Sequence, residues 1–465
     1  MNPIPIPIAP VLSLFAELFS HRCIQGWIDS QESISGSRGF YRRIYSLAVT
    51  LWYLIYQRLN ADKTLDAAVK DLRAGGADRL SPSRRQPLSK KVRSHDTTSY
   101  NDARQRMPVE FLLWALGKIG TSAQKAFKTV ALANRSFQLL DGSSLAIASN
   151  LAVTPHYPPA RNQHGCSDWC LMRVVLGFCA VSGVILSAIE GPMLLSEQAL
   201  SWSLMAQAVA STVWIADRNF GVWSVVAQAL HHHQDVIVRM THARAQRIGR
   251  GRTWVSGQDE IITWHRTKHD KFAPGTADVL VQGRLIYVRV CREGHFMDLW
   301  LFTTLLDREA FPVSRLVELY GWRWQVELDF RYVKTQLDMQ MLDVRSAPMA
   351  RREFYAGLIA YDLVRLMMAT AEQPEGDHPA PALSFSQVRR VLVLWLAEWG
   401  KDWRSRRGSL AEKVQRLIDQ VAQQCLPKRT KPRLSEPRRV RRRPKTFPTL
   451  RGSRQAAREK MLPSK

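Results

Sequence analysis

The stretch YGWRWQVELDFRYVK, residues 320–334, places Tyr320, Arg323, Glu327 and Lys334 at successive separations of 3, 4 and 7 residues. In a regular helix of 3.6 residues per turn, these separations bring all four side chains to one face. Such a face is either a row of surface ion pairs, the usual role of charges on a helix, or part of a polar site. Acids elsewhere in the chain distinguish the two interpretations.

Two more acids follow apolar stretches that are predicted to be strands. Asp141 lies in LLDGSS, where we expect a strand, a tight turn at the glycine and a continuation, and Asp217 lies in VWIADRNFG, where a strand ends at a turn. Each alone could be an ordinary turn residue. Together with Glu327 they indicate a catalytic site, because sites in α/β proteins cluster where strands end.

Three carboxylates brought together repel one another and need cations to stay ionised at neutral pH. Hard divalent ions with oxygen ligands fit this need, and we expect two Mg²⁺ ions, with Mn²⁺ able to substitute. Two such ions can activate a nucleophile and stabilise the leaving oxygen of a phosphodiester. The acids therefore predict phosphodiester chemistry.

The composition agrees with a nucleic-acid partner. The chain has 465 residues, and 66 Lys and Arg against 40 Asp and Glu give a net charge of +26. Such an excess points to a polyanion, either nucleic acid or an anionic membrane surface. The hydrophobic content of 46% excludes whole-chain disorder, and 6 Cys exclude a disulfide-stapled chain. The uncharged run from Val174 to Ile189 is too short to span a membrane and is predicted to form two strands around a Ser-Gly turn.

The pattern along the chain predicts six regions. Residues 1–130 read as helical and DNA-binding, with a regular apolar stripe from Tyr41 to Leu59. An α/β core is expected in 131–233 and 307–372, interrupted by a β-rich insertion in 234–306. A helical region follows in 373–425. The last stretch, 426–465, has 15 Lys and Arg against 2 Glu, and we expect a disordered basic tail.

Two short helices around a basic loop in the N-terminal region are similar to a helix-turn-helix. The second, polar helix carries Tyr100, Asn101, Arg104 and Arg106 and would enter a major groove. The pattern equally allows a solvated helical face.

The quoted stretch also resembles a known family. The spacing Y-(2)-R-(3)-E-(6)-K matches the signature of the IS-four type of bacterial insertion-sequence transposases, which are DDE enzymes with a ribonuclease-H-like core. LLDGSSL and IADRNFG are similar to the first and second acidic motifs of that family, in the expected order. SYNDARQRMP resembles a stretch of its N-terminal region, with Met107 in place of the usual Leu.

The resemblance implies roles for individual residues. Asp141, Asp217 and Glu327 would hold the metal ions and carry out catalysis. Tyr320, Arg323 and Lys334, together with Arg104 and Arg106, would contact DNA. Trp300, in LWLFTTL, is similar to a tryptophan on which members of the family stack a flipped base, although it could equally be a core residue of a strand.

The expected protein is a cut-and-paste transposase, cytoplasmic and associated with the bacterial nucleoid. It would cleave the terminal inverted repeats of its element and join the 3′ ends to target DNA, with or without a hairpin intermediate. Its partners would be double-stranded DNA and a second copy of itself in the synaptic complex, and not a membrane. Two alternatives are a DNA-binding repressor without catalysis and a ribonuclease-H-like nuclease that only hydrolyses.

Overall fold

The computed structural model describes residues 9–31, 44–82, 85–127, 135–162, 165–292, 295–372, 382–402 and 409–427, with isolated positions beyond them. Residues Met1–Leu426 form one compact unit, and Pro427–Lys465 are assigned to another. The fold below is that of the first unit. The tail expected in 426–465 lies almost entirely outside the described residues, and the finer division of the first unit into regions stays a prediction.

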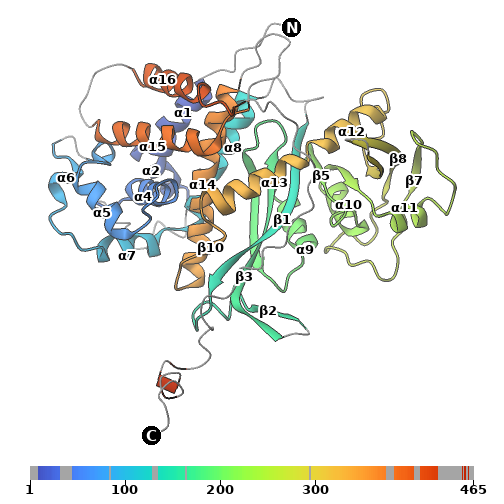
Figure 1. The fold of residues 1–465 in the computed structure, drawn as a ribbon, viewed down its shortest axis with the longest axis horizontal. Coiled ribbons are helices and arrows are strands. Elements are labelled where there is room, and N and C mark those ends of the chain that lie inside the picture. Colours follow the sequence, from blue (N-terminus) through green and yellow to red (C-terminus); the bar gives the residue numbers. More distant parts are fainter. Residues whose placement is uncertain are drawn as a thin grey trace. The chain divides into compact units, whose positions relative to one another are not determined.

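A ten-stranded sheet forms the centre of the unit, with helices on both sides, so the expected mixed α/β fold is confirmed (Figure 1). Strand β1 pairs antiparallel with β3, and β3 pairs antiparallel with β4. On its other edge β1 pairs parallel with β5, and β5 pairs parallel with β6. The antiparallel strands β9, β8 and β7 continue the sheet beyond β6. The strands are β1 Ser136–Ala148, β2 Pro159–Asn162, β3 Gly165–Cys179, β4 Ile185–Pro192, β5 Thr212–Ala216, β6 Asp235–Arg239, β7 Asp259–Thr263, β8 Gln282–Arg292, β9 His295–Thr303 and β10 Met341–Leu342.

Strand β1 corrects one expectation. The tight turn expected at Gly142 is absent, and β1 continues without a break through Asp141 and Gly142. The long partner strand β3 explains this, because it pairs with β1 along the whole segment, including Asp141 with Leu176 and Gly142 with Val175. The apolar run from Val174 to Ile189 does form two strands, the end of β3 and the start of β4, joined by a turn at Gly183.

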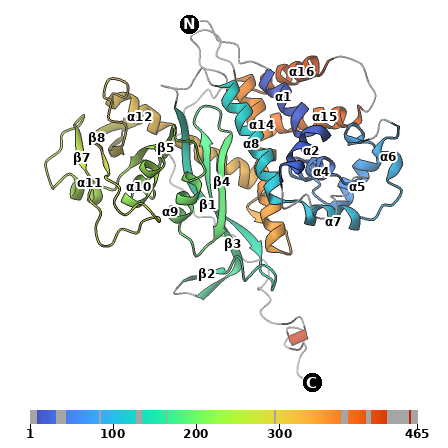
Figure 2. The ribbon, with the colours of Figure 1, turned by 180° about the vertical axis from the view of Figure 1, so that it is seen from behind.

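The two faces of the sheet bury different helices. Leu140 and Trp214 pack with Leu200 of α9 on one face, and Leu139 and Ile215 pack into the larger helical core on the other. Helix α13 crosses the second face of β1 in Figure 1, and α9 lies in front of the sheet in the opposite view of Figure 2. The helices between and after the strands are α9 Glu197–Met205, α10 Trp223–His231, α11 His242–Ile248, α12 Val313–Gly321, α13 Trp324–Arg331 and α14 Ala347–Ala371.

The region before β1 is helical in its described parts. Helix α4 confirms the helix expected from the apolar stripe, but it is buried on nearly every side rather than along one stripe. Gly75, with φ of 91°, follows α5 where the sequence predicts a stop. The elements are α1 Ala9–Leu18, α2 His21–Asp29, α4 Leu47–Leu59, α5 Leu65–Arg73, the 3₁₀ turn η1 Asp78–Leu80, α6 Leu88–Lys91, α7 Thr98–Arg106 and α8 Val109–Ala126.

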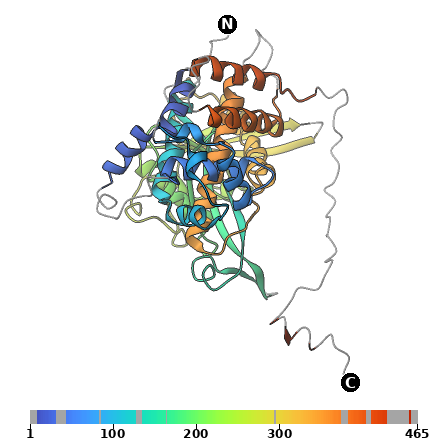
Figure 3. The same ribbon diagram turned by 90° about the vertical axis from the view of Figure 1, so that its left-hand side faces the viewer.

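Helix α14 is the central helix of the unit. It contacts α4 and α8 from the N-terminal part and α15 (Phe385–Lys401) and α16 (Leu410–Ala422) from the C-terminal part. Figure 3 shows these first and last helices of the unit stacked side by side. Within the described residues α14 is the helix long and apolar enough to cross a membrane, but 94% of its apolar window is buried inside the protein. Its composition therefore reflects a core position.

The stretch 320–334 is not one regular helix. Helix α12 ends at Gly321, α13 begins at Trp324, and residues Tyr332–Gln336 (η4) form a π-helical turn. The expectation that four side chains share one face of a single helix is therefore wrong in its geometry. The break and the π-turn change the angle between the side chains, since each departs from 3.6 residues per turn.

Candidate active site

Asp141 and Asp217 lie side by side on neighbouring strands. The parallel register pairs Leu140 with Ala216, so the two aspartates are the next residues on their strands. They also point to the same face of the sheet, because Leu139 and Ile215, two residues earlier on each strand, are both buried in the core on the side of α13. The expected position at the end of a strand is confirmed for Asp217 and is wrong for Asp141, which lies within β1.

The surroundings of Asp141 disfavour its charge. Its side chain is 22% exposed, and burial raises its pKa to about 6. Asp217 and Glu197 raise the pKa further by repulsion, whereas the backbone amide of Gly142 and the guanidinium of Arg323 lower it. The Gly142 amide donates to Asp141 Oδ1 at 2.8 Å. A carboxylate held in this way would be stabilised by a nearby cation.

Arg323 bridges the first and third acids. One guanidinium nitrogen lies 4.0 Å from Asp141 Oδ2, and the other donates to Glu327 Oε1 at 3.5 Å. The Arg323 side chain is 13% exposed, and the Glu327 side chain is 45% exposed. The structure therefore brings Glu327 to the same site as Asp141, with a cation between the two carboxylates.

Tyr320 and Lys334 complete the expected set. Tyr320 is buried and hydrogen-bonded to Arg323, and burial raises the pKa of its phenol. Lys334 lies in the π-helical turn, where burial lowers the pKa of its ammonium group and the charge of Asp141 raises it. Arg323 and Lys334 thus lie near Asp141, and Tyr320 and Glu327 are connected to it through Arg323.

Glu197 is a fourth acid at the site, and the sequence analysis missed it. It is the first residue of α9, and its Oε2 accepts a hydrogen bond from Asn219 Nδ2 at 2.6 Å. Burial raises its pKa, Asp217 raises it further, and Arg173 and Asn219 lower it. Nothing in the sequence singles it out, because an acid in the first turn of a helix is expected from the helix dipole alone.

The carboxylates were tested as ligands for the expected divalent ions. Carboxylate oxygens suit Mg²⁺ and Mn²⁺, and the raised pKa of Asp141 indicates a place that a cation would stabilise. Within the part of the chain that the structure describes, however, no three His, Cys, Asp or Glu side chains lie close enough to form a metal site. Asp141 and Asp217 are neighbouring carboxylates of the kind that suits the expected ions, and Glu327 is linked to Asp141 through Arg323.

Trp300 lies outside this group. It is 4% exposed on β9, where it stacks on Tyr287 with ring centroids 4.5 Å apart and meets Trp254 edge-on at 5.3 Å. His242 contacts it at 5.8 Å. Of the two interpretations given from the sequence, the geometry matches the core residue of a strand, because the ring is enclosed by other aromatic rings.

The two arginines of the expected recognition helix are placed differently. Arg104 of α7 forms an ion pair with Glu353 of α14, which also binds Arg58, and its side chain is 12% exposed. Its guanidinium serves an internal link between helices, so we do not retain it as a DNA contact. Arg106 is exposed at the end of the same helix. Tyr100 is fully buried and donates to Gln57 Oε1, so this helix faces the core with one side.

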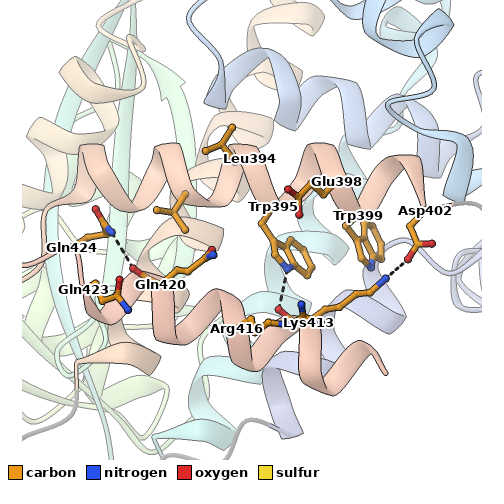
Figure 4. Close-up of a pocket in the computed structure, with 11 residues that line it drawn as sticks. Leu394, Trp395, Glu398, Trp399, Asp402, Lys413, Arg416, Gln420, Gln423 and Gln424 are labelled. Atoms are coloured by element: carbon orange, nitrogen blue, oxygen red, sulfur yellow. Dashed lines mark hydrogen bonds and ion pairs between the residues drawn. The ribbon is translucent and has the colours of Figure 1, made fainter. Parts of the chain in front are cut away.

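A separate cavity of about 490 Å³ lies between α15 and α16 (Figure 4). Trp395 crosses it and donates from Nε1 to the Lys413 carbonyl at 3.1 Å, while Lys413 reaches Asp402. None of the acids of the site lines this cavity. A site that works on a long polymer does not need a closed pocket, so we place the chemistry at the sheet and not here.

Two aspartates on adjacent strands and a glutamate linked to the first of them through an arginine agree with the arrangement expected of a DDE transposase. Residues 133–363, which include all three acids, match the family model described as "Transposase DDE domain". The chain is also 25% identical over 292 residues to the transposase InsG for insertion sequence element IS4 of Escherichia coli K12. Both matches support the resemblance to DDE transposases of the IS4 type.

The matches are partial. The alignment with the E. coli transposase covers 60% of this chain and 61% of that protein. Among solved structures, the piggyBac transposase synaptic complex with hairpin DNA is similar at a TM-score of 0.42 and 10% identity, over 91% of this chain and 86% of the other.

Proposed function

We propose that the protein is a DNA transposase that cleaves the ends of its own insertion sequence and joins their 3′ ends to target DNA. The observation that carries the proposal is the grouping of Asp141 on β1 and Asp217 at the end of β5 with Glu327, Arg323 and Lys334. Acids alone could hold ions, and bases alone could bind phosphates. Their combination suits the cleavage of a phosphodiester.

We also propose that the strands β4, β3, β1, β5 and β6 form a ribonuclease-H-like core. Three antiparallel strands followed by two that run parallel to the first support it. Strands β7, β8 and β9 would then be the β-rich insertion, since they lie between Asp217 and Glu327 in the sequence. The insertion expected in 234–306 would accordingly begin after β6, because β6 pairs parallel with β5. The helices before β1 and after α14 would be the N-terminal and C-terminal regions.

The two aspartates would hold divalent ions, with Glu327 as a further ligand. When bound, such ions lower the pKa of a water or a 3′-hydroxyl and offset charge on the leaving oxygen. Arg323 is suited to grip a phosphate as a fork, and Lys334 as a point charge. Arg323 would exchange its two carboxylate partners for a phosphate of the transposon end, which frees Glu327. Tyr320 would hold Arg323 in position through their hydrogen bond.

Double-stranded DNA is the proposed partner, with a second copy of the chain in the complex that joins two ends. The net charge of +26 supports DNA as the partner. The buried position of Trp300 does not support stacking of a flipped base on that ring.

The test is cleavage of a plasmid that carries the inverted repeats of the element, with Mg²⁺ or Mn²⁺ present. We expect the wild type to release the ends and to join them to a target plasmid, and Asp141→Ala and Glu327→Ala to do neither. Cleavage at the wild-type rate by either variant would overturn the mechanism. Binding without cleavage by the wild type would indicate a repressor, and cleavage without joining would indicate a nuclease.

A further inference from the structure

Glu197 touches both segments that carry the aspartates. It follows the N-cap Ser196, whose hydroxyl accepts from the Ala199 amide, so the position of its backbone is fixed at the start of α9. From there its side chain reaches β1 at Gly142 and the turn after β5 at Asn219. Among the interactions of the described residues, Glu197 is the acid of the candidate site that contacts both segments.

The contact with β1 explains the glycine after Asp141. A Cβ added to Gly142 would lie 2.4 Å from Glu197 Cδ and 2.8 Å from its Oε1, which is far inside van der Waals contact. Gly142 has an ordinary strand backbone, so the need for glycine comes from space and not from conformation. The Glu197 carboxyl group therefore rests directly on the backbone next to Asp141.

The contact with the turn leads to Asp217. The backbone amide of Asn219 donates to Asp217 Oδ1 at 2.8 Å, and its side-chain amide donates to Glu197. Gln198, the next residue of α9, donates from Nε2 to the Asn219 carbonyl and to its Oδ1, both at 2.9 Å. Asn219 is thus held at four points, and the same residue orients the Asp217 carboxylate.

We propose that Glu197 is a positioning residue that fixes the distance between Asp141 and Asp217 by resting on Gly142 and holding Asn219. The proposal rests on the proposed function only for why that distance matters, since paired ions need ligands at a set spacing. A third carboxylate beside two others has an electrostatic cost. The hydrogen bond that it accepts from Asn219 is of the stronger, charge-assisted kind, and offsets that cost.

We call the contacts of Glu197 with Gly142 and Asn219 the clamp. Hydrogen exchange of peptides that span 213–222 tests the clamp without metal or DNA. We expect Glu197→Ala to speed exchange in this turn by about tenfold, whereas Glu197→Gln, whose amide oxygen can still accept from Asn219, stays within about threefold of the wild type. Gly142→Ala should reproduce the loss, because the added methyl group displaces Glu197. The matched control is Glu110→Ala, which removes an exposed acid from the first turn of α8.

Titration calorimetry with Mn²⁺ measures whether loss of the clamp weakens metal binding. Supporting groups of metal sites are worth about 10- to 100-fold in affinity, so we expect at least a tenfold loss for Glu197→Ala and less than threefold for Glu197→Gln. Equal losses for both variants would make Glu197 a direct ligand and overturn the positioning role, as would unchanged exchange in Glu197→Ala. If the wild type neither binds Mn²⁺ nor cuts DNA, the proposed function fails, while hydrogen exchange still decides whether the clamp exists.

The double variant Gly142→Ala with Glu197→Ala separates the clamp from general damage. Because both single changes break the same contact, the double variant should exchange no faster than the worse single variant. Additive losses would overturn the proposal. If Glu197→Ala does not fold, Gly142→Ala and Glu197→Gln still provide the comparison.

Discussion

Asp141 and Asp217 stand on neighbouring parallel strands, whereas Glu327 stands on an eight-residue helix between an irregular turn and a π-helical turn. The backbone pairing of β1 with β5, which ends one residue before the aspartates, and the contacts of Glu197 position these two side chains. The glutamate is 45% exposed and is held through Arg323. In the proposed function, the sheet would therefore provide two ligands at a set spacing, and the helix would provide a third that is less firmly held.

The largest expected effect is on catalysis. A measurement of metal binding on the same variants distinguishes the two aspartates of the sheet from Glu327 of the helix. Asp141→Asn, Asp217→Asn and Glu327→Gln should each lower the rate of end cleavage by on the order of 10³-fold, as for groups that act in the transition state. Calorimetry with Mn²⁺ and no DNA should show about a tenfold loss of affinity for the two aspartate variants and less than threefold for Glu327→Gln. An equal loss in all three would show that Glu327 belongs to the preset part of the site. Glu318→Gln on α12 is the control.

The next effect concerns the contacts that hold helix α13, which carries Glu327, in place. Asp329, two residues after Glu327, is fully buried; burial raises its pKa to about 6, and Arg365 of α14 and Tyr361 lower it. Asp329→Ala leaves the buried Arg365 with less compensation, and should lower the free energy of unfolding by about 3 kcal/mol in urea denaturation. Glu318→Ala removes a 54% exposed acid from a surface ion pair and should change little. A similar small change for Asp329→Ala would mean that α13 is held by apolar packing alone.

The smallest expected effect is on the free energy of unfolding, and it concerns Asp141 on the sheet. The pKa of Asp141 is raised from 3.8 to about 6 in the folded protein, so the metal-free protein loses stability as the pH rises from about 4 through 6. Asp141→Asn removes this loss and should stabilise the protein by on the order of 1 kcal/mol at pH 8 in EDTA. The gain should shrink at pH 5, as thermal unfolding at the two pH values can show.

Asp278→Asn, which changes an exposed acid, should give no such pH-dependent gain. A destabilised Asp141→Asn at pH 8 would show that Arg323 more than offsets the burial of the carboxylate. In that case Arg323 would already compensate the charge of Asp141 in the metal-free protein. The contrast between the two aspartates of the sheet and Glu327 of the helix would then weaken.

Residue types and spacings were enough to propose the acids and bases of the candidate site, because phosphodiester chemistry requires such groups. The strands were also predictable, since Leu139, Leu140 and residues 213–216 are apolar and directly precede the two aspartates. The angles between the side chains of the stretch 320–334 were not predictable. A count of residues from Tyr320 to Lys334 contains no sign of the helix break or of the π-turn, which depend on packing against α14 and β1.

Contacts made by distant residues were also hidden from the sequence. Glu197 meets Asn219 and Gly142 only because α9 packs on the sheet, and Arg104 pairs with Glu353 across 249 positions. Both residues could only be interpreted by their local pattern, which gave no role to the first and an external role to the second. Trp300 was undecided for the same reason, since its enclosure depends on Tyr287 and Trp254.

Helix α14 depends for its burial on elements that are translated after it. Helices α4 and α8, which precede it, cover part of its surface, but α15 and α16 follow it in the sequence. Until they emerge from the ribosome, a helix with the hydropathy of a membrane span is only partly covered. A ribosome that stalls before Phe385 would therefore release a chain prone to aggregation. Besides any other role, α15 and α16 thus protect α14 from contact with other chains.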